Sequence, residues 1–153
     1  MQHDLELGLL KYSKELKVKT IDGKRYIFDE IRRKWLVLQP EEMVRQLIIH
    51  YLLTEKGYNK NRLSLEKGLK VNTLSKRFDV LAYDMQMQPF LLIECKAPQV
   101  PVGTAAFQQI ANYNTTLKVP YLLVSNGREN YCCFIDYERE NFLFLDAIPD
   151  FQN

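Results

Sequence analysis

Hydrophobic and polar residues alternate along the chain in a pattern that predicts short strands before one long helix. Apolar runs bounded by turn residues predict strands at Tyr26–Phe28 and Lys34–Leu38, with a turn at Ile21–Lys24 before them. Pro40 then suits the first turn of a helix, which Gly57 can end. The first half of the chain therefore predicts strands that lead directly into a helix.

Two glutamates stand at the start of this helix, where the positive end of the helix dipole favours them. The apolar face comprises Met43, Val44, Leu47, Ile48, Tyr51 and Leu52. On a helical wheel Glu41 lies at the flank of that face, whereas Glu42 points almost directly away from it. Glu41 is therefore expected to be able to reach a site at the edge of the core. The alternative is that both glutamates only interact with the helix dipole.

The stretch from Arg77 to Ala97 predicts two antiparallel strands that carry charged residues on a buried surface. If Met85–Gln88 forms the turn, Asp84 pairs with Pro89, and Asp79 then lies opposite Glu94. Lys96 returns to the same face by the period of two. The four apolar residues before Glu94 indicate a strand that is covered on both faces. Charged groups in such a place predict a functional site.

The remaining pattern predicts further strands and one more helix. The strands are expected at Leu63–Glu66, Lys70–Asn72, 119–124, 131–135 and 141–145, and the helix runs from Thr104 to about Leu117. This order favours an α/β or α+β domain in which helices flank a mixed central sheet. A single domain over residues 1–153, with its core at about 40–126, is expected.

Composition narrows the class of protein. The 153 residues are 46% apolar and 26% charged, as in ordinary globular domains. We expect a cytoplasmic protein with free thiols and no membrane contact, because there is no long apolar run, no secretory signal and no disulfide spacing. The segment Thr54–Arg77 holds seven lysines and arginines but only two glutamates. This excess suits a phosphate-bearing partner, although a solubilising loop would have the same composition.

The chemistry of the central stretch points to a metal. Two carboxylates as close as Asp79 and Glu94 repel each other, and a divalent cation removes that conflict. Their hard oxygen atoms favour Mg²⁺ or Mn²⁺. Elsewhere the sequence has no histidine at zinc-ligand spacing from a cysteine, no glycine-rich phosphate loop and no serine or cysteine nucleophile beside a base.

In this context Asp79, followed by Glu94-Cys95-Lys96, resembles the active-site core of the PD-(D/E)XK nuclease superfamily. Phe78 replaces the proline of the family name. The stretches PEEMVRQ (40–46), LEKGLKV (65–71), KRFDVLAYD (76–84), LLIECKAP (91–98) and FQQIANYN (107–114) resemble one branch, the N-terminal nuclease domain of the restriction subunit of type I restriction enzymes. The resemblance covers roughly residues 20–145 and includes a Q-x-x-x-Y motif.

The resemblance implies a role for each matching residue. Asp79, Glu94 and the backbone carbonyl of Cys95 would hold Mg²⁺ or Mn²⁺, and Lys96 would orient the attacking water. Glu41 would supply a further ligand. DNA contacts would come from Gln109 and Tyr113 of the motif, with Lys76 and Arg77 among the basic residues beside the site.

The expected activity is thus Mg²⁺-dependent DNA cleavage. The chain has no room for the ATP-dependent motor that follows this domain in the full subunit, so a separate motor or specificity protein is an expected partner. Two alternatives remain open: a non-catalytic or partner-dependent DNA-binding module of the same fold, and a structural domain in which Glu94 and Lys96 form a simple ion pair.

Overall fold

The computed structural model describes residues 4–65, 68–71, 74–77, 79–103, 105–108, 110 and 118–151. Its helices are the 3₁₀ helix η1 (Leu9–Glu15), the α-helix α1 (Pro40–Thr54) and the 3₁₀ helix η2 (Lys60–Arg62). Its strands are β1 (Val18–Ile21), β2 (Lys24–Asp29), β3 (Lys34–Val37), β4 (Leu63–Leu65), β5 (Gly68–Val71), β6 (Leu74–Arg77), β7 (Val80–Tyr83), β8 (Pro89–Cys95), β9 (Tyr121–Ser125), β10 (Asn130–Asp136) and β11 (Asn141–Phe144). Residues 105–108 and 110 are also helical.

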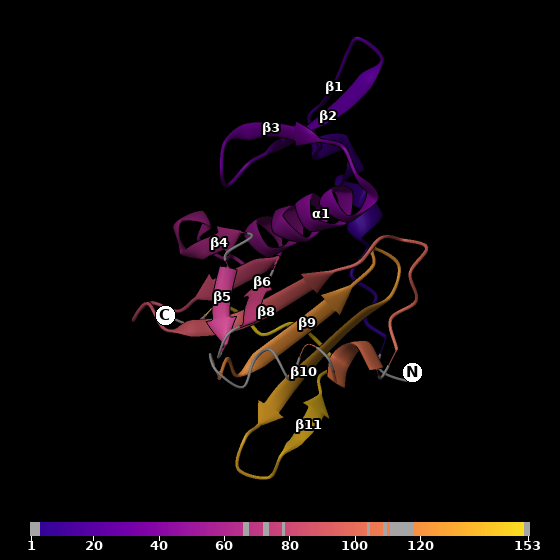
Figure 1. Cartoon of the computed structure of the whole chain (residues 1–153). Coiled ribbons are helices and arrows are strands. Elements are labelled where there is room, and N and C mark those ends of the chain that lie inside the picture. The colour runs from indigo at the N-terminus through magenta and orange to yellow at the C-terminus, as the bar shows by residue number, and fades with distance from the viewer. Residues whose placement is uncertain are drawn as a thin grey trace.

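The main sheet has six strands in the order β11-β10-β9-β8-β7-β4 (Figure 1). Strands β8 and β9 are parallel, while the other neighbouring strands are antiparallel. This mixed sheet confirms the predicted fold class. The closing hairpin is likewise confirmed as β10–β11.

Both faces of the central strand β8 are buried, as its apolar run predicts. Leu91 and Ile93 belong to the core beneath α1, and both have no exposed surface. Leu92 points to a second core on the opposite face, which contains Phe107 and Ile110 of the short helical segment. The vicinal cysteines divide in the same way, Cys132 into the first core and Cys133 into the second. The two cores together hold β8 in the middle of the domain.

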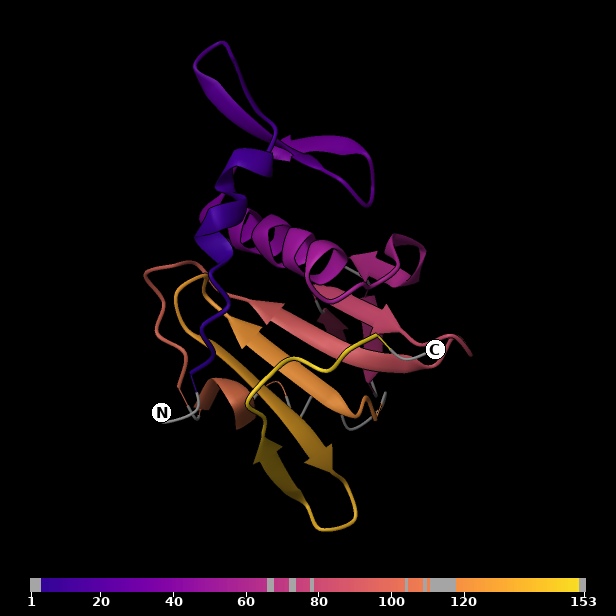
Figure 2. The same cartoon turned by 180° about the vertical axis from the view of Figure 1, so that it is seen from behind.

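A second, three-stranded sheet formed by β1, β2 and β3 lies on the far side of α1 from the main sheet (Figure 2). This second sheet explains why the prediction that Glu42 points away from the buried part of the protein is wrong. Glu42 is only 8% exposed, whereas Glu41 is exposed. The hydrophobic pattern of a helix predicts one buried face. A helix that lies between two sheets has two buried faces. Glu41 does lie at the margin, as predicted.

The hairpin around the predicted site differs from the expectation at both ends. The register of its middle is as predicted, with Val80 opposite Ile93. At the turn, however, a bulge makes Tyr83 rather than Asp84 the partner of Pro89. The Asp84 carboxylate accepts the backbone N–H groups of Gln86 and Gln88, both at 2.9 Å, and so stabilises a longer turn.

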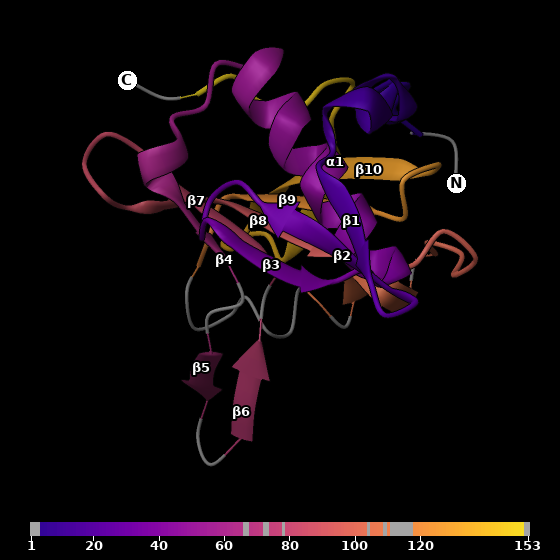
Figure 3. The same ribbon diagram turned by 90° about the horizontal axis from the view of Figure 1, so that it is seen from above.

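At the other end of the hairpin, the predicted continuous strand is interrupted at Asp79, which lies in a bend between β6 and β7. Strand β6 pairs instead with β5 in a separate hairpin that projects from the main sheet (Figure 3). None of the helices in the described ranges is long and apolar enough to cross a lipid bilayer.

Candidate active site

The bend at Asp79 places its carboxylate against the end of the neighbouring strand. Oδ2 of Asp79 accepts the backbone N–H of Cys95 at 2.7 Å. This bond is possible because β7 and β8 are hydrogen-bonded neighbours, and because the chain leaves the ladder before Val80. The bond fixes one oxygen of the Asp79 carboxylate, and the Asp79 side chain is also hydrogen-bonded to that of Glu94.

Glu94 and Lys96 stand on either side of Cys95, at the carboxyl end of β8. The ammonium group of Lys96 lies 3.4 Å from Oε1 of Glu94. The backbone N–H of Lys96 donates to the carbonyl oxygen of Ser125 at 2.8 Å, which extends the parallel pairing with β9 by one residue. The position of Lys96 is therefore set by the sheet and not by a free loop.

The two carboxyl groups affect each other's protonation. Burial, followed by the negative charge of Asp79, raises the pKa of Glu94 to about 7, although Lys96 opposes this shift. Burial also raises the pKa of Asp79, and this rise is opposed by the Cys95 N–H and the charge of Arg45. Two such carboxyls retain a proton near neutral pH unless another cation offsets their charge.

The start of α1 brings a third carboxylate to this place. One small cavity of about 70 Å³ is lined by Asp79 together with Gln39, Glu41, Glu42 and Arg45. The charge of Glu41 contributes to the raised pKa of Asp79. The predicted approach of Glu41 to the central stretch is therefore present in the structure.

Arg45 is a charged residue of this site that the sequence analysis missed. It is 4% exposed, and its Nε donates to Oε2 of Glu42 at 2.8 Å. Gln46 donates to the same oxygen at 3.2 Å, and Arg32 lies 3.8 Å from the other oxygen of Glu42. The spacing of Arg45 from Glu41 and Glu42, at i+4 and i+3, was the available signal.

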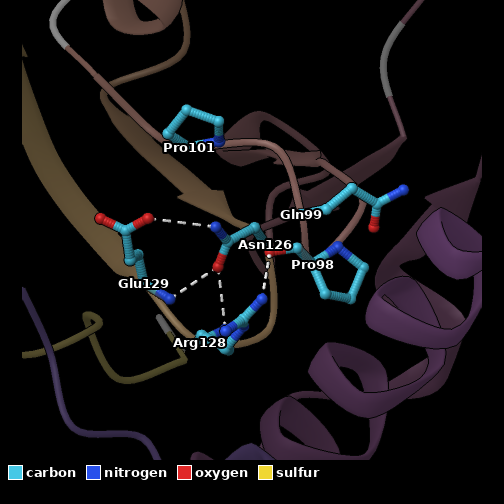
Figure 4. Close-up of a pocket in the computed structure, with 6 residues that line it drawn as sticks. All are labelled: Pro98, Gln99, Pro101, Asn126, Arg128 and Glu129. Atoms are coloured by element: carbon cyan, nitrogen blue, oxygen red, sulfur yellow. Dashed lines mark hydrogen bonds between the residues drawn. The ribbon is translucent and has the colours of Figure 1, made fainter.

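The loop that follows Lys96 is held by the β9–β10 turn (Figure 4). Nδ2 of Asn126 donates to the carbonyl of Val100 at 2.8 Å, and Nη2 of Arg128 donates to the carbonyl of Pro98 at 3.1 Å. Between the two loops lies an open cavity of about 340 Å³, which is lined by Pro98, Gln99, Pro101, Asn126, Arg128 and Glu129. No feature of the sequence pattern predicted this bracing, because it joins two loops far apart in the chain.

The structure says less about the expected DNA-binding residues. Gln109 and Tyr113 lie outside the described residues, and Lys76 and Arg77 are described only by their backbone in β6. Within the basic segment, Lys56 pairs with Asp150 at 2.8 Å. The ligand role of the Cys95 carbonyl stays a prediction.

The donor set fits Mg²⁺. Within the described ranges, no three His, Cys, Asp or Glu side chains form a ready-made metal site. Asp79 and Glu94 instead provide two carboxylates beside a small polar cavity. Mg²⁺ usually keeps several waters and is held by one or two carboxylates together with substrate phosphates. A pair of carboxylates, with Glu41 lining the same cavity as Asp79, agrees with that preference.

Comparison with known proteins places this chain in a family. No curated protein matches the chain. Among solved structures, the fragment of a putative HsdR subunit of a type I restriction enzyme from Vibrio vulnificus YJ016 is similar, with a TM-score of 0.53 and 21% identity. The similarity covers 73% of this chain and 24% of that one, so the chain spans about a quarter of that fragment's length. The family model of the type I restriction enzyme R protein N terminus matches residues 40–149. The chain therefore belongs to the family of type I restriction enzyme R protein N-terminal regions.

Proposed function

We propose that this domain is a Mg²⁺-dependent DNA endonuclease of the PD-(D/E)XK type. The observation that carries the proposal is the buried pair Asp79 and Glu94, with the ammonium group of Lys96 3.4 Å from Glu94. A pair of carboxylates that disfavours its own ionisation gains from a divalent cation. Membership of the restriction family supplies the substrate class, DNA.

Each side chain would have a distinct part in phosphodiester hydrolysis. When bound, Mg²⁺ would polarise the scissile phosphate and lower the pKa of a bound water. Asp79 would hold the ion from the bend before β7, and Glu94 would hold it from the carboxyl end of β8. Lys96 would orient the attacking water and stabilise the negative charge that develops on the phosphate. Glu41 would fix a water molecule beside Asp79.

A role within a larger restriction system is part of the proposal. The similar HsdR fragment is about four times longer than the matched region. A separate motor or specificity protein would then bring DNA to this domain in the cytoplasm. The competing function is a DNA-binding module that does not cut, and it predicts salt-sensitive binding without metal-stimulated cleavage.

Nicking of a supercoiled plasmid in Mg²⁺, Mn²⁺ or EDTA tests the proposal. Wild type should nick the plasmid with either metal and not in EDTA. Lys96→Met should lower the rate roughly 10²- to 10³-fold, the loss typical of one transition-state-stabilising group. Lys14→Met, on exposed η1, is the matched control and should nick normally. Equal rates for wild type and Lys96→Met, or nicking that survives EDTA, would contradict the proposal.

A further inference from the structure

The sheet of β1, β2 and β3 carries an outward face whose composition is unusual for a surface. The register pairs Lys19 with Tyr26, Tyr26 with Val37, and Phe28 with Trp35. Because side chains alternate along a strand, these residues share one face, and Ile27 with Asp29 share the other. Ile27 and Asp29 have no exposed surface. The aromatic face is therefore the one directed away from α1.

Large apolar side chains remain exposed on this face. Trp35 is 38% exposed, Val37 40% and Ile21 49%. Tyr26 and Phe28, which are half-buried, complete a surface of three aromatic rings. The rings of Phe28 and Trp35 lie 5.3 Å apart at an interplanar angle of 63°. Exposed apolar groups gathered in this way mark binding surfaces more often than scattered ones do.

Positive charges surround the rings. Nζ of Lys19 lies 4.2 Å from the centroid of the Trp35 ring, and Lys17 and Arg33 lie 5.3 and 5.7 Å from that of Phe28. Lys24 is on the same face, opposite Ile21. In the fully described segment 17–37, no acidic residue occupies an outward strand position; Glu30, in the turn, lies 3.7 Å from Lys17. This combination of charge and rings complements a ligand that has both phosphates and flat faces.

We propose that the outward face of the β1–β3 sheet binds unpaired nucleotides of a nucleic-acid strand. Bases would stack on Trp35 and Phe28, and Lys17, Lys19 and Lys24 would turn to the phosphates. Aromatic rings that carry stacked bases beside a basic track are the general solution for binding single strands. The lysine now above Trp35 is not an obstacle, because base stacking is stronger than an exposed cation–π contact. The many positive charges around the rings complement a nucleic acid better than they complement a protein partner.

The position of the face relates it to the candidate active site. Trp35 precedes Gln39 by four residues, so their Cα atoms are at most about 14 Å apart. Gln39 lines the small cavity with Asp79. The sheet also precedes residues 40–149, the region that matches the family model. Placing a strand near Asp79 rests on the proposed function, whereas binding to the face does not.

The single tryptophan of the chain makes the proposal directly testable. The probe is an oligothymidine of about 10 nucleotides, within the usual site size for single-strand binding, in EDTA so that cleavage plays no part. The oligonucleotide should quench Trp35 emission, because stacking brings a base against the indole ring. Trp35→Ala should weaken binding of the labelled oligonucleotide roughly 5- to 100-fold by fluorescence anisotropy.

Matched variants separate this site from the catalytic one. Leu143→Ala, on exposed β11, should bind the oligonucleotide like wild type. Lys96→Met should also bind the oligonucleotide, with normal quenching of Trp35 emission, even though it fails to cut DNA. Failure of the nuclease proposal would therefore leave this binding result unchanged. Unchanged Trp35 emission together with equal affinities for wild type and Trp35→Ala would overturn the inference, and would leave a protein partner as the occupant of the face.

Discussion

Replacing Glu94 by glutamine should stabilise the metal-free protein at alkaline pH. Glutamine resembles the protonated form of glutamate in shape and lacks its charge. The pKa of Glu94 is raised from 4.5 to about 7 by burial and by the charge of Asp79. In the folded state the carboxyl group therefore keeps a proton that the unfolded chain has already released.

The sign of the pH dependence follows from proton binding. Between pH 4.5 and about 7 the folded state holds more protons than the unfolded state, so the free energy of unfolding falls as pH rises. The contribution of Glu94 is complete below pH 4.5 and lost above about pH 7. Asp79, whose pKa is also raised, acts in the same direction.

The magnitude is large for one residue. A shift of this size corresponds to about 3 kcal/mol at 1.36 kcal/mol per pKa unit. The Glu94 side chain is only 19% exposed, so solvent screening reduces this value little. Glu94→Gln should therefore be more stable than wild type by about 2–3 kcal/mol at pH 8, and similar to it at pH 4.5. The melting temperature at pH 8 should rise by roughly 5–10 °C.

Urea unfolding followed by circular dichroism, at several pH values in EDTA, measures this difference. Addition of Mg²⁺ at pH 8 should stabilise wild type, by about 2.7 kcal/mol at a concentration 100 times the dissociation constant, and stabilise Glu94→Gln much less. Glu138→Gln, at the exposed end of the closing hairpin, is the matched control. A wild-type protein whose stability does not fall between pH 5 and pH 8, or a Glu94→Gln variant that is less stable than wild type at pH 8, would contradict the raised pKa of Glu94.

Three further predictions concern the packing around the site. Glu42→Leu removes the buried carboxylate to which Arg45 donates, and should cost about 3–5 kcal/mol of stability by urea unfolding. Glu42→Leu with Arg45→Met should recover most of this loss, and equal stabilities for the single and double variants would contradict the prediction. Ile93→Ala should lower the free energy of unfolding by about 2–5 kcal/mol because Ile93 is fully buried, while Leu143→Ala should change it by less than about 0.5 kcal/mol. A loss for Ile93→Ala as small as that for Leu143→Ala would contradict the burial of β8. Burial raises the pKa of the thiols of Cys95, Cys132 and Cys133, the last to about 12. Iodoacetamide should therefore modify these thiols only when the protein unfolds, and rapid labelling of the native protein would contradict their burial.

The sequence was sufficient to predict the centre of the site because that part depends on local pattern. The apolar run before Glu94 identified a strand buried on both faces, and the hairpin register placed Asp79 beside it. The details that it missed are set by backbone geometry at the strand ends. The bend at Asp79 and the bulge at Tyr83 each change where a side chain points without changing the hydrophobic pattern.

The environment of α1 was harder to predict for a different reason. A helical wheel reports the side chains of one helix and not what covers each face. Glu42 and Arg45 look like solvent-exposed residues by type, yet both are buried and form an ion pair. Long-range packing of this kind, like the bracing of the loop after Lys96 by Asn126, has no local signal in a single sequence.

Single-turnover cleavage of DNA already bound to the protein tests the central claim most directly. DNA is bound in EDTA, the reaction is started with excess Mg²⁺, and the loss of intact DNA is followed for wild type, Asp79→Asn and Glu94→Gln. We expect cleavage by wild type, none by either variant, and equal DNA affinity for all three. Cleavage by the variants at the wild-type rate, or none by wild type at full occupancy, would contradict the assignment of Asp79 and Glu94 as the carboxylates of a nuclease site.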